Sequence, residues 1–305
     1  MPICRSVQSA VSPALTALAI RAQDTADMAD LEFNRVLFGS HPYARPEAGY
    51  PETIQAISRE DIKEFHQTHF SPKGMVIVIV GAIHANQAYD LVNQTLGSWS
   101  SENSLSDPVL PPIPKLNQTV RRHLPIPGKF QSDLVMGTLG PKRNSEDYMP
   151  ASLGNDILGQ FGLMGRIGDV VREQAGLAYY ASTSLNSWID AGTWEVSAGI
   201  NPQNLQRAID LIIQELDRFV REPVSKQEIE DSQSNFIGRL PLSLESNFGV
   251  ASAILKLERF QLGLDYYLKY HDLIYSITPE MILETARKYL DTKTLCIISA
   301  GPDES

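Results

Sequence analysis

Two segments of the chain, 220 residues apart, share one sequence pattern without a gap. Residues 57–81 read ISREDIKEFHQTHFSPKGMVIVIVG, and residues 277–301 read ITPEMILETARKYLDTKTLCIISAG. Each opens with Ser or Thr two residues before an acidic residue, which predicts a capped helix start, and continues with apolar residues at helical spacing. The closing apolar run predicts a strand covered on both faces. Identical pairs are Ile57/Ile277, Glu60/Glu280, Ile62/Ile282, Glu64/Glu284, Lys73/Lys293, Ile77/Ile297 and Gly81/Gly301.

This repeat indicates two unequal copies of one α/β domain. Residues 100–114 are rich in Ser and Pro, which excludes helix and central strand and is typical of a linker. We therefore predict a first domain at 1–100, a linker at 101–118 and a second domain at 119–305. The second copy has about 150 residues before its helix–strand unit and the first only about 55, so the first copy lacks roughly 80 residues at its start.

The second copy begins with strand patterns and continues mostly with helix patterns. This order favours an α+β fold, with an antiparallel-rich sheet and helices on one face. Besides the repeat, strands are expected at residues 119–124, 132–138, 178–185 and 193–199. Helices are expected at residues 146–158, 166–174, 202–219, 226–239, 247–261 and 279–290.

Charge and cysteine content exclude several classes of partner. The net charge is −10 without a Lys/Arg run, so a phosphate backbone would be repelled and we expect no nucleic-acid partner. Cys4 and Cys296 form neither a disulfide framework nor a metal site, which fits a reducing compartment. No apolar run approaches the ~20 residues that span a bilayer. Residues 11–20 predict a helix that continues through 21–30, and the expected location is cytoplasmic, without a membrane partner.

The chain lacks the histidine motifs of zinc peptidases, since neither HExxH nor HxxEH occurs. His66 and His69 share a face of a predicted helix, but no nearby Cys, Asp or Glu completes a set of three ligands. The residues thus predict no metal bound by this chain. Three carboxylates are expected to be solvated helix positions: Glu228, Glu230 and Asp265.

A glycine-rich run, GQFGLMGRIG, follows the helix expected at 146–158. Gly159, Gly162, Gly165 and Gly168 recur at every third residue. Because a helix precedes them and the Walker lysine is absent, they predict a crossing between helices rather than a phosphate-binding loop.

The stretch after this run combines an arginine and a tyrosine at a helix–strand junction. The helix at 166–174 is expected to end at a Gly176 cap, with Arg172 near its end and Tyr179 at the start of the next strand. A guanidinium and a phenol there can donate hydrogen bonds to peptide carbonyls or to an oxyanion. The other interpretation is an ordinary surface Arg–Glu pair and a half-buried strand tyrosine.

Longer runs resemble the M16 zinc peptidases, the pitrilysin, insulinase and processing peptidase family. VREQAGLAYYAS at residues 171–182 is similar to the Arg-x6-Tyr signature of that family's second domain. The run from 31 to 83 contains HPY, a later Gly, and a Val-rich strand that ends in Gly, in the same order as the family. The resemblance covers Arg21 to Pro302, and the glycine-rich run stands in the place of the family's loop between helices.

The resemblance implies a duplicated α+β fold around a chamber that binds extended peptides. In the family, zinc and the general base come from HxxEH and a later Glu in the first domain, the portion that the first copy lacks. Arg172 and Tyr179 match the pair that contacts the substrate backbone and the developing oxyanion, and we expect Gly159, Gly162 and Gly165 to bind substrate. Zinc is then expected only in a partner subunit or in a missing N-terminal segment.

Four hypotheses follow. In the first, the chain is inactive alone and supplies Arg172 and Tyr179 to a partner that bears HxxEH, or associates with itself. In the second it is a structural relative, like the core proteins of respiratory complexes. In the third it captures extended peptides without cleaving them. In the fourth, unrelated to peptidases, it is a small-molecule enzyme that uses the glycine-rich loop.

Overall fold

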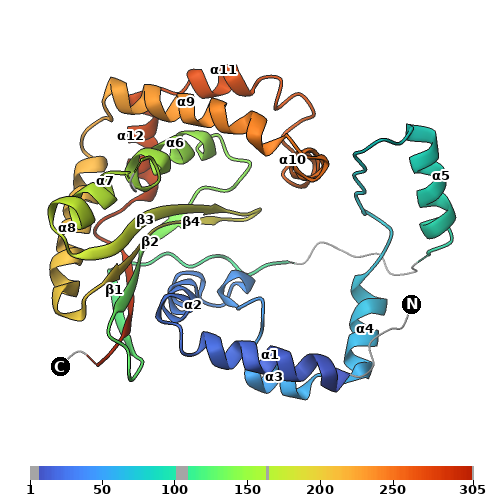
Figure 1. The fold of residues 1–305 in the computed structure, drawn as a ribbon, viewed down its shortest axis with the longest axis horizontal. Coiled ribbons are helices and arrows are strands. Elements are labelled where there is room, and N and C mark those ends of the chain that lie inside the picture. Colours follow the sequence, from blue (N-terminus) through green and yellow to red (C-terminus); the bar gives the residue numbers. More distant parts are fainter. Residues whose placement is uncertain (1–6, 101–108, 163–164, 304–305) are drawn as a thin grey trace.

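Strands from the second half of the chain form one mixed sheet (Figure 1). In the computed structural model, which describes residues 7–100, 109–162 and 165–303, the strand order is β1-β5-β2-β4-β3. β1 runs parallel to β5, and the other neighbouring pairs are antiparallel. The strands expected in the second half of the chain are confirmed, as β1 (Val120–Pro125), β2 (Ser132–Gly140), β3 (Ala178–Ser187), β4 (Gly192–Ile200) and β5 (Cys296–Gly301).

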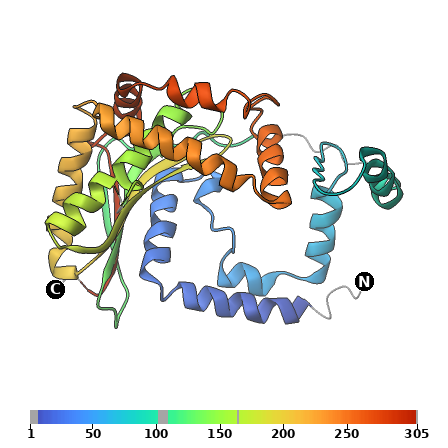
Figure 2. The ribbon, with the colours of Figure 1, turned by 45° about the horizontal axis from the view of Figure 1, so that its top comes forward.

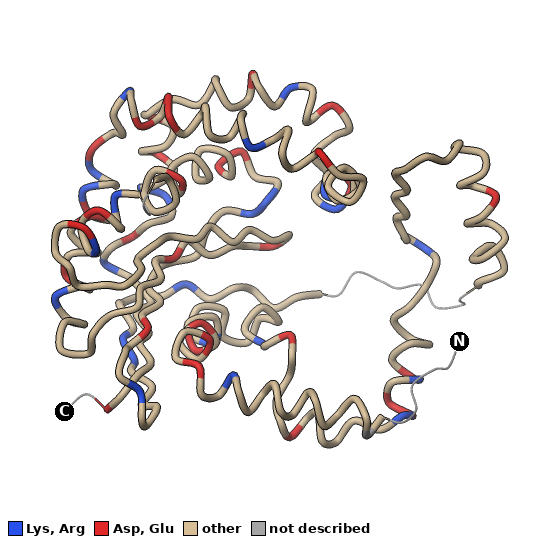
Figure 3. Tube along the Cα trace, in the orientation of Figure 1, with Lys and Arg blue, Asp and Glu red and all other residues tan. Residues whose placement is uncertain are grey.

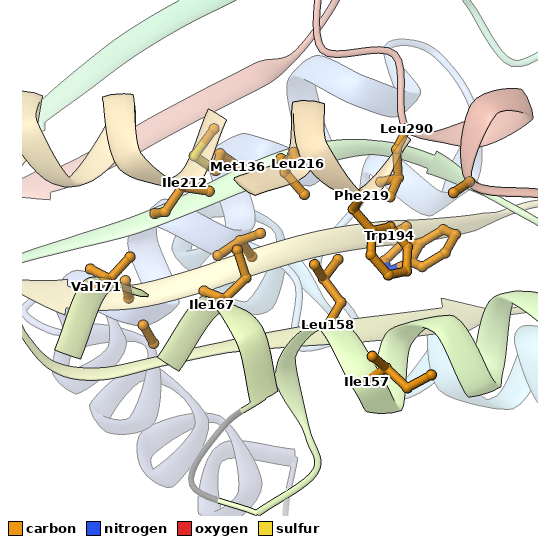
Figure 4. Close-up of a cluster of buried hydrophobic side chains, with 14 of the residues drawn as sticks. Met136, Ile157, Leu158, Ile167, Val171, Trp194, Ile212, Leu216, Phe219 and Leu290 are labelled. Carbon is orange, nitrogen blue, oxygen red and sulfur yellow. The ribbon is translucent and has the colours of Figure 1, made fainter. Parts of the chain in front are cut away.

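Helices of the second half cover one face of this sheet. Trp194 of β4 lies in their shared core and meets Phe219 edge to face, with ring centroids 6.3 Å apart (Figure 4). Burial of such aromatic and aliphatic side chains is the main stabilising contribution here. The helices of this half are α6 (Tyr148–Gly159), α7 (Gly165–Gly168), η2 (Asp169–Gln174), η3 (Pro202–Asn204), α8 (Leu205–Phe219), α9 (Lys226–Ser243), α10 (Asn247–Arg259), α11 (Tyr270–Tyr275) and α12 (Pro279–Tyr289).

The opposite face of the sheet is covered by α2 (Thr25–Phe38), a helix of the first segment (Figure 2). Phe33 and Phe38 of α2 are fully buried in a second core with Val135 and Ile298. The expectation of helices on one face alone was therefore wrong for this sheet. β2 and β5 are buried on both faces, and the cover for their second face comes from a helix more than 90 residues earlier in the chain.

The N-terminal helix does not continue through 21–30 as expected. α1 (Val7–Arg21) ends, and α2 begins after the Asp24 cap, whose side chain accepts a 2.9 Å hydrogen bond from the N–H of Asp27. A capping aspartate satisfies an otherwise unpaired N–H and so favours a new helix start. η1 (Pro42–Ala44) and α3 (Pro51–Ala56) follow.

Residues 57–97 lie away from the sheet and leave apolar side chains exposed (Figure 2). α4 (Arg59–His69) forms as expected after the Ser58 cap, and α5 (Ala85–Leu96) follows. Between them residues 75–80 form no strand, so that expectation was wrong. Ile77 is 45% exposed, whereas its repeat counterpart Ile297 in β5 is 4% exposed. The cause is the lack of a neighbour, because no described strand lies beside 75–80 to accept its backbone hydrogen bonds.

The predicted linker joins the two segments without regular structure from 109 to 118, and its residues 101–108 lie outside the described ranges. Among the described helices, none has both the length and the apolar composition that crossing a bilayer requires.

Candidate functional site

Arg172 lies in a π-helical turn. α7 runs directly into η2, so the helix expected at 166–174 exists but widens after Gly168. The turn ends as predicted at Gly176, which has φ of +64° and donates its N–H to the Arg172 carbonyl oxygen over 3.1 Å. Single π turns are rare and occur frequently at functional sites.

Tyr179 lies at an irregularity in the edge strand β3. Ala178 pairs with Ile200 and Tyr180 pairs with Gly199, so Tyr179 is the extra residue of a β-bulge. Its side chain is 83% exposed, which excludes the half-buried tyrosine of the alternative interpretation. Bulges redirect a side chain out of the regular alternation of a strand and are common beside active sites.

The neighbouring Tyr180 is fixed to the sheet. Its hydroxyl donates a 2.8 Å hydrogen bond to Asp133, and burial together with that carboxylate raises the pKa of Tyr180. Asp133 is nearly buried and also accepts hydrogen bonds from Gln131, over 2.9 Å, and from the Thr25 hydroxyl at the start of α2. This network holds β3, β2 and α2 together directly beside Tyr179.

The guanidinium of Arg172 has a weak partner. Its Nε lies 3.6 Å from Oε1 of Glu173, and both side chains are partly exposed. An exposed pair at this distance contributes at most ~1 kcal/mol, so most of the guanidinium donors stay available for a ligand. The Arg–Glu pair of the alternative interpretation is therefore present, but it leaves most N–H donors of Arg172 without a partner in that pair.

Arg166 and Glu228 anchor the start of α7. Two hydrogen bonds, of 2.6 and 2.8 Å, join the guanidinium to the carboxylate, and Glu215 lies 3.7 Å away. Although burial opposes it, the hydrogen bonds from Arg166 and Ser225 lower the pKa of Glu228 to about 2. The expectation of a solvated Glu228 was therefore wrong, whereas Glu230 and Asp265 are exposed. The ion pair ties α7, and so the turn that carries Arg172, to α8 and α9.

The glycine-rich run forms the predicted crossing from α6 to α7. A Cβ on Gly159 would lie 2.4 Å from the Thr183 backbone nitrogen, and one on Gly165, where φ is +61°, would lie 2.6 Å from the Gly159 nitrogen. These two glycines therefore allow the helix ends to approach β3 and each other closely. Gly162, with φ of +62°, has open space on its Cβ side. Residues 163–164 of the loop lie outside the described ranges.

The histidine pair of α4 has aromatic neighbours. His69 stacks on Phe65 with centroids 4.4 Å apart, and His66 stacks on Phe70 at 5.1 Å. Nowhere in the described ranges do three His, Cys, Asp or Glu side chains gather in a way that could hold a metal ion. Asp156 of α6 is buried and accepts a 2.8 Å hydrogen bond from Ser232 of α9.

The chain matches known proteins over most of its length. Residues 56–236 match the family model described as the peptidase M16 inactive domain. An uncharacterized zinc protease of Streptomyces coelicolor is 26% identical over 300 residues, which is 95% of this chain and 64% of that protein. A probable inactive metalloprotease of Bacillus subtilis, YmfF, is 21% identical over 262 residues, 82% of this chain and 58% of that protein. The chain thus spans less than two thirds of these relatives.

Solved structures share the fold. A peptidase M16 inactive domain from Pseudomonas fluorescens superposes with a TM-score of 0.89 at 23% identity, covering 97% of this chain and 70% of that one. A chain of complex III from Candida albicans superposes with a TM-score of 0.80 at 16% identity, covering 95% of this chain and 70% of that one.

Proposed function

The chain belongs to the peptidase M16 inactive domain family, and we propose that it acts as a subunit without a zinc site of its own. In this proposal it binds extended peptides and contributes Arg172 and Tyr179 to the site of a zinc-bearing M16 partner. Hydrolysis requires both proteins, and this chain alone is inactive.

The position of Tyr179 carries the proposal. Its phenol forms no hydrogen bond with another described residue, and the bulge holds it outward at the end of an edge strand, beside the anchored Tyr180. A sheet gains little from exposing an aromatic side chain, so the arrangement suits contact with another molecule. A free phenol can donate a hydrogen bond to a carbonyl oxygen and still accept one.

Arg172 complements this donor. Its guanidinium is planar and always charged, and the long contact with Glu173 is weak enough for a ligand to displace. In this proposal the two donors, seven residues apart in sequence and held on irregular backbone, bind carbonyl groups of one extended peptide. The pair can therefore fix the peptide and stabilise the oxygen on which negative charge develops.

The described residues do not fit a zinc site. His66 and His69 are exposed on α4 and stack on phenylalanines, and no third ligand lies with them among the described residues. We therefore assign the metal to the partner and assign to this chain only binding and oxyanion stabilisation.

Residues 57–97 support the need for a partner. In the second copy, Ile282 and Ile297 of the repeat are buried between α6, β1 and β2, whereas their counterparts Ile62 and Ile77 are 51% and 45% exposed. We propose that the two units are duplicates and that residues 75–80 become a strand when another polypeptide supplies the missing neighbours. Such apolar surface is usually covered by association.

A structural role is the second candidate. The likeness to a chain of complex III favours it, since that fold occurs in an assembly. In a purely structural subunit the pair at 172 and 179 would have no effect on turnover.

A partner-dependent peptidase assay distinguishes the two functions. The chain is co-purified with an HxxEH-bearing M16 subunit and assayed with fluorogenic peptides, alone and combined. We expect turnover only in combination, reduced by Arg172→Lys because an ammonium cannot replace the planar set of donors. Full activity with Arg172→Lys, or equal activity of the partner alone, would favour the structural role.

A further inference from the structure

A second site lies at the other end of β3 from Tyr179. A cavity of about 710 Å³ opens between the β3 end at residues 185–188 and helices α9 and α10. Its volume falls in the usual range of ligand sites, about 300–1,000 Å³. Asn186, which lines it, is seven residues beyond Tyr179, and at roughly 3.3 Å per residue the two are about 23 Å apart along the strand.

Four cations and no acidic residue are found among the described residues that line this cavity. Arg143 comes from the loop after β2, Arg239 from α9, and Lys256 and Arg259 from α10 (Figure 3 marks the Lys and Arg positions along the chain). None of the four forms an ion pair with a described residue, whereas Arg166, Arg218 and Lys288 elsewhere in the same half do. In a chain with a net charge of −10, this uncompensated group creates a local positive potential.

Arg143 is held in place by aromatic rings. Its guanidinium carbon lies 4.0 Å from the Tyr148 ring centroid, 5.6 Å from that of Phe260 and 5.8 Å from that of Tyr266. Stacking on a ring occupies the face of a guanidinium and leaves the N–H groups in its plane for hydrogen bonds; one contact of Arg143 there is with the Tyr266 hydroxyl, and further N–H groups remain for a ligand. Those groups can bind a carboxylate through two parallel hydrogen bonds.

Tyrosines supply further donors to the same cavity. Burial raises the pKa of Tyr266, Tyr267 and Tyr270, so their phenols stay protonated at neutral pH. The Tyr266 hydroxyl already donates to the Met149 sulfur over 3.4 Å, so Tyr267 and Tyr270 are the phenols that can donate to a carboxylate. The rings of all three can pack against apolar groups. The cavity therefore combines charge, hydrogen-bond donors and aromatic surface.

We propose that this cavity binds a carboxylate of an extended peptide, either its C-terminus or an acidic side chain, together with an adjoining apolar side chain. The proposal deepens the function above, on which the peptide nature of the ligand rests. A peptide in contact with Tyr179 that follows β3 would place its acidic group in the cavity about seven residues away, given the rise of an extended chain.

Binding is measured by fluorescence anisotropy of the whole chain with four ten-residue peptides. The peptides differ in two ways: one end residue is Glu or Gln, and the C-terminus is free or amidated. The four peptides cover all combinations. We expect the peptide with both carboxylates blocked to bind at least about tenfold more weakly than the tightest, and this difference to shrink at high salt. If replacing Glu by Gln lowers the affinity, the acidic side chain binds; if amidation lowers it, the C-terminal carboxylate binds. Equal binding of all four peptides would overturn the proposal.

The double variant Arg239→Gln with Lys256→Gln tests the location. Both side chains are exposed, so the fold should survive, and affinity for the acidic peptide should fall about five- to tenfold. Arg207→Gln on α8 is a matched exposed control outside the cavity and should have no effect. Unchanged binding in the double variant would contradict the site, as would inorganic phosphate that competes as well as the peptide does.

This test separates the cavity from the proposed catalytic role. Tyr179→Phe should leave the Glu-to-Gln difference in affinity intact, even if it abolishes turnover with the partner. If Tyr179→Phe loses the difference and the double variant keeps it, the carboxylate binds at Tyr179, and the cavity site is refuted.

Discussion

The Tyr180 hydroxyl donates a 2.8 Å hydrogen bond to Asp133, while the phenol next to it, on Tyr179, points outward and is 83% exposed. The bulge at Tyr179 separates the two side chains, so neighbouring tyrosines face different environments. One is part of the network that holds the sheet to α2, and the other is available to another molecule. Their variants should therefore behave differently.

Tyr180→Phe should cost stability and leave function intact. Asp133 keeps its bonds to Gln131 and Thr25 but loses one donor, which typically costs about 1–2 kcal/mol. Urea unfolding followed by circular dichroism measures the loss, and peptide turnover with a partner should change by less than about twofold. Unchanged stability would show that the network does not depend on this hydroxyl.

Glu195 should make the protein less stable as pH rises. Only 6% of this β4 residue is exposed, and burial raises the pKa of its carboxyl from an ordinary 4.5 to about 7, although Thr193 and Asn186 hydrogen-bond to it. A folded pKa above the unfolded one gives stability that is full below pH 4.5 and is lost as pH rises towards 7.

Glu195→Gln removes this titration. The variant should match the wild type near pH 4.5 and exceed it by up to about 3 kcal/mol at pH 8, because 1 pKa unit corresponds to about 1.4 kcal/mol. Free energies of unfolding measured from pH 4.5 to 8 test the prediction. A difference that does not grow with pH would mean that Glu195 ionises normally in the folded state.

Two glycines of the crossing loop should respond differently to alanine. Gly159→Ala would bring a Cβ to 2.4 Å from the Thr183 nitrogen, so backbone must move and the loss should reach at least about 3 kcal/mol. Gly162→Ala meets no atom within 4 Å and should cost only about 1–2 kcal/mol, through its φ of +62°.

Only Gly162→Ala, the less destabilising of the two variants, can report on substrate binding. If Gly162 contacts substrate, Gly162→Ala should raise KM for partner-dependent cleavage, whereas an unchanged KM would remove Gly162 from the substrate-binding set. Thermal melting of both variants provides the comparison of stability.

The exposed surface of residues 57–97 should drive association. Ile77 and Ile79 are 45% and 48% exposed, and replacing both by Lys places charge where a neighbouring strand would pack. We expect the wild type to form an oligomer or a stable complex at micromolar concentration by light scattering, and the double variant to dissociate. Val109→Lys, at a fully exposed apolar residue elsewhere, is the control. A monomeric wild type that also fails to bind an M16 partner would contradict this prediction.

Local pattern predicted most elements of the second half, but not features that depend on distant contacts. The helix expected at 202–219 and the caps at Ser58 and Thr278 depend on local signals, and they were identified correctly. The same apolar pattern forms a strand at 296–301 but not at 75–80, because only residues 296–301 have neighbouring strands to pair with. The packing of α2 against the sheet could not be predicted from local sequence either, because it brings together segments about 100 residues or more apart.

The candidate residues Arg172 and Tyr179 came from the sequence, and their role stays a prediction. Arg172 and Tyr179 follow from a short run, whereas the π turn and the bulge that present them depend on the packing of α7 against β3. The cationic cavity was missed because its residues, from Arg143 to Arg259, are scattered over more than 100 positions. The cluster of Tyr266, Tyr267 and Tyr270 was the one local signal that could have indicated it.

We propose that Tyr179 acts on substrate and contributes little to the stability of the fold. Tyr179→Phe removes only an exposed hydroxyl that no described residue uses, so the melting temperature should stay within about 1 °C of wild type. If the hydroxyl stabilises a developing oxyanion, kcat of the reconstituted complex should fall ~10²–10³-fold, as for loss of one oxyanion donor.

The most direct measurement is therefore kcat and Tm of Tyr179→Phe, taken on the same preparation in complex with the HxxEH-bearing partner. We expect kcat to fall at least ~10²-fold while Tm stays unchanged. Wild-type kcat would contradict it and leave Tyr179 without a role in catalysis.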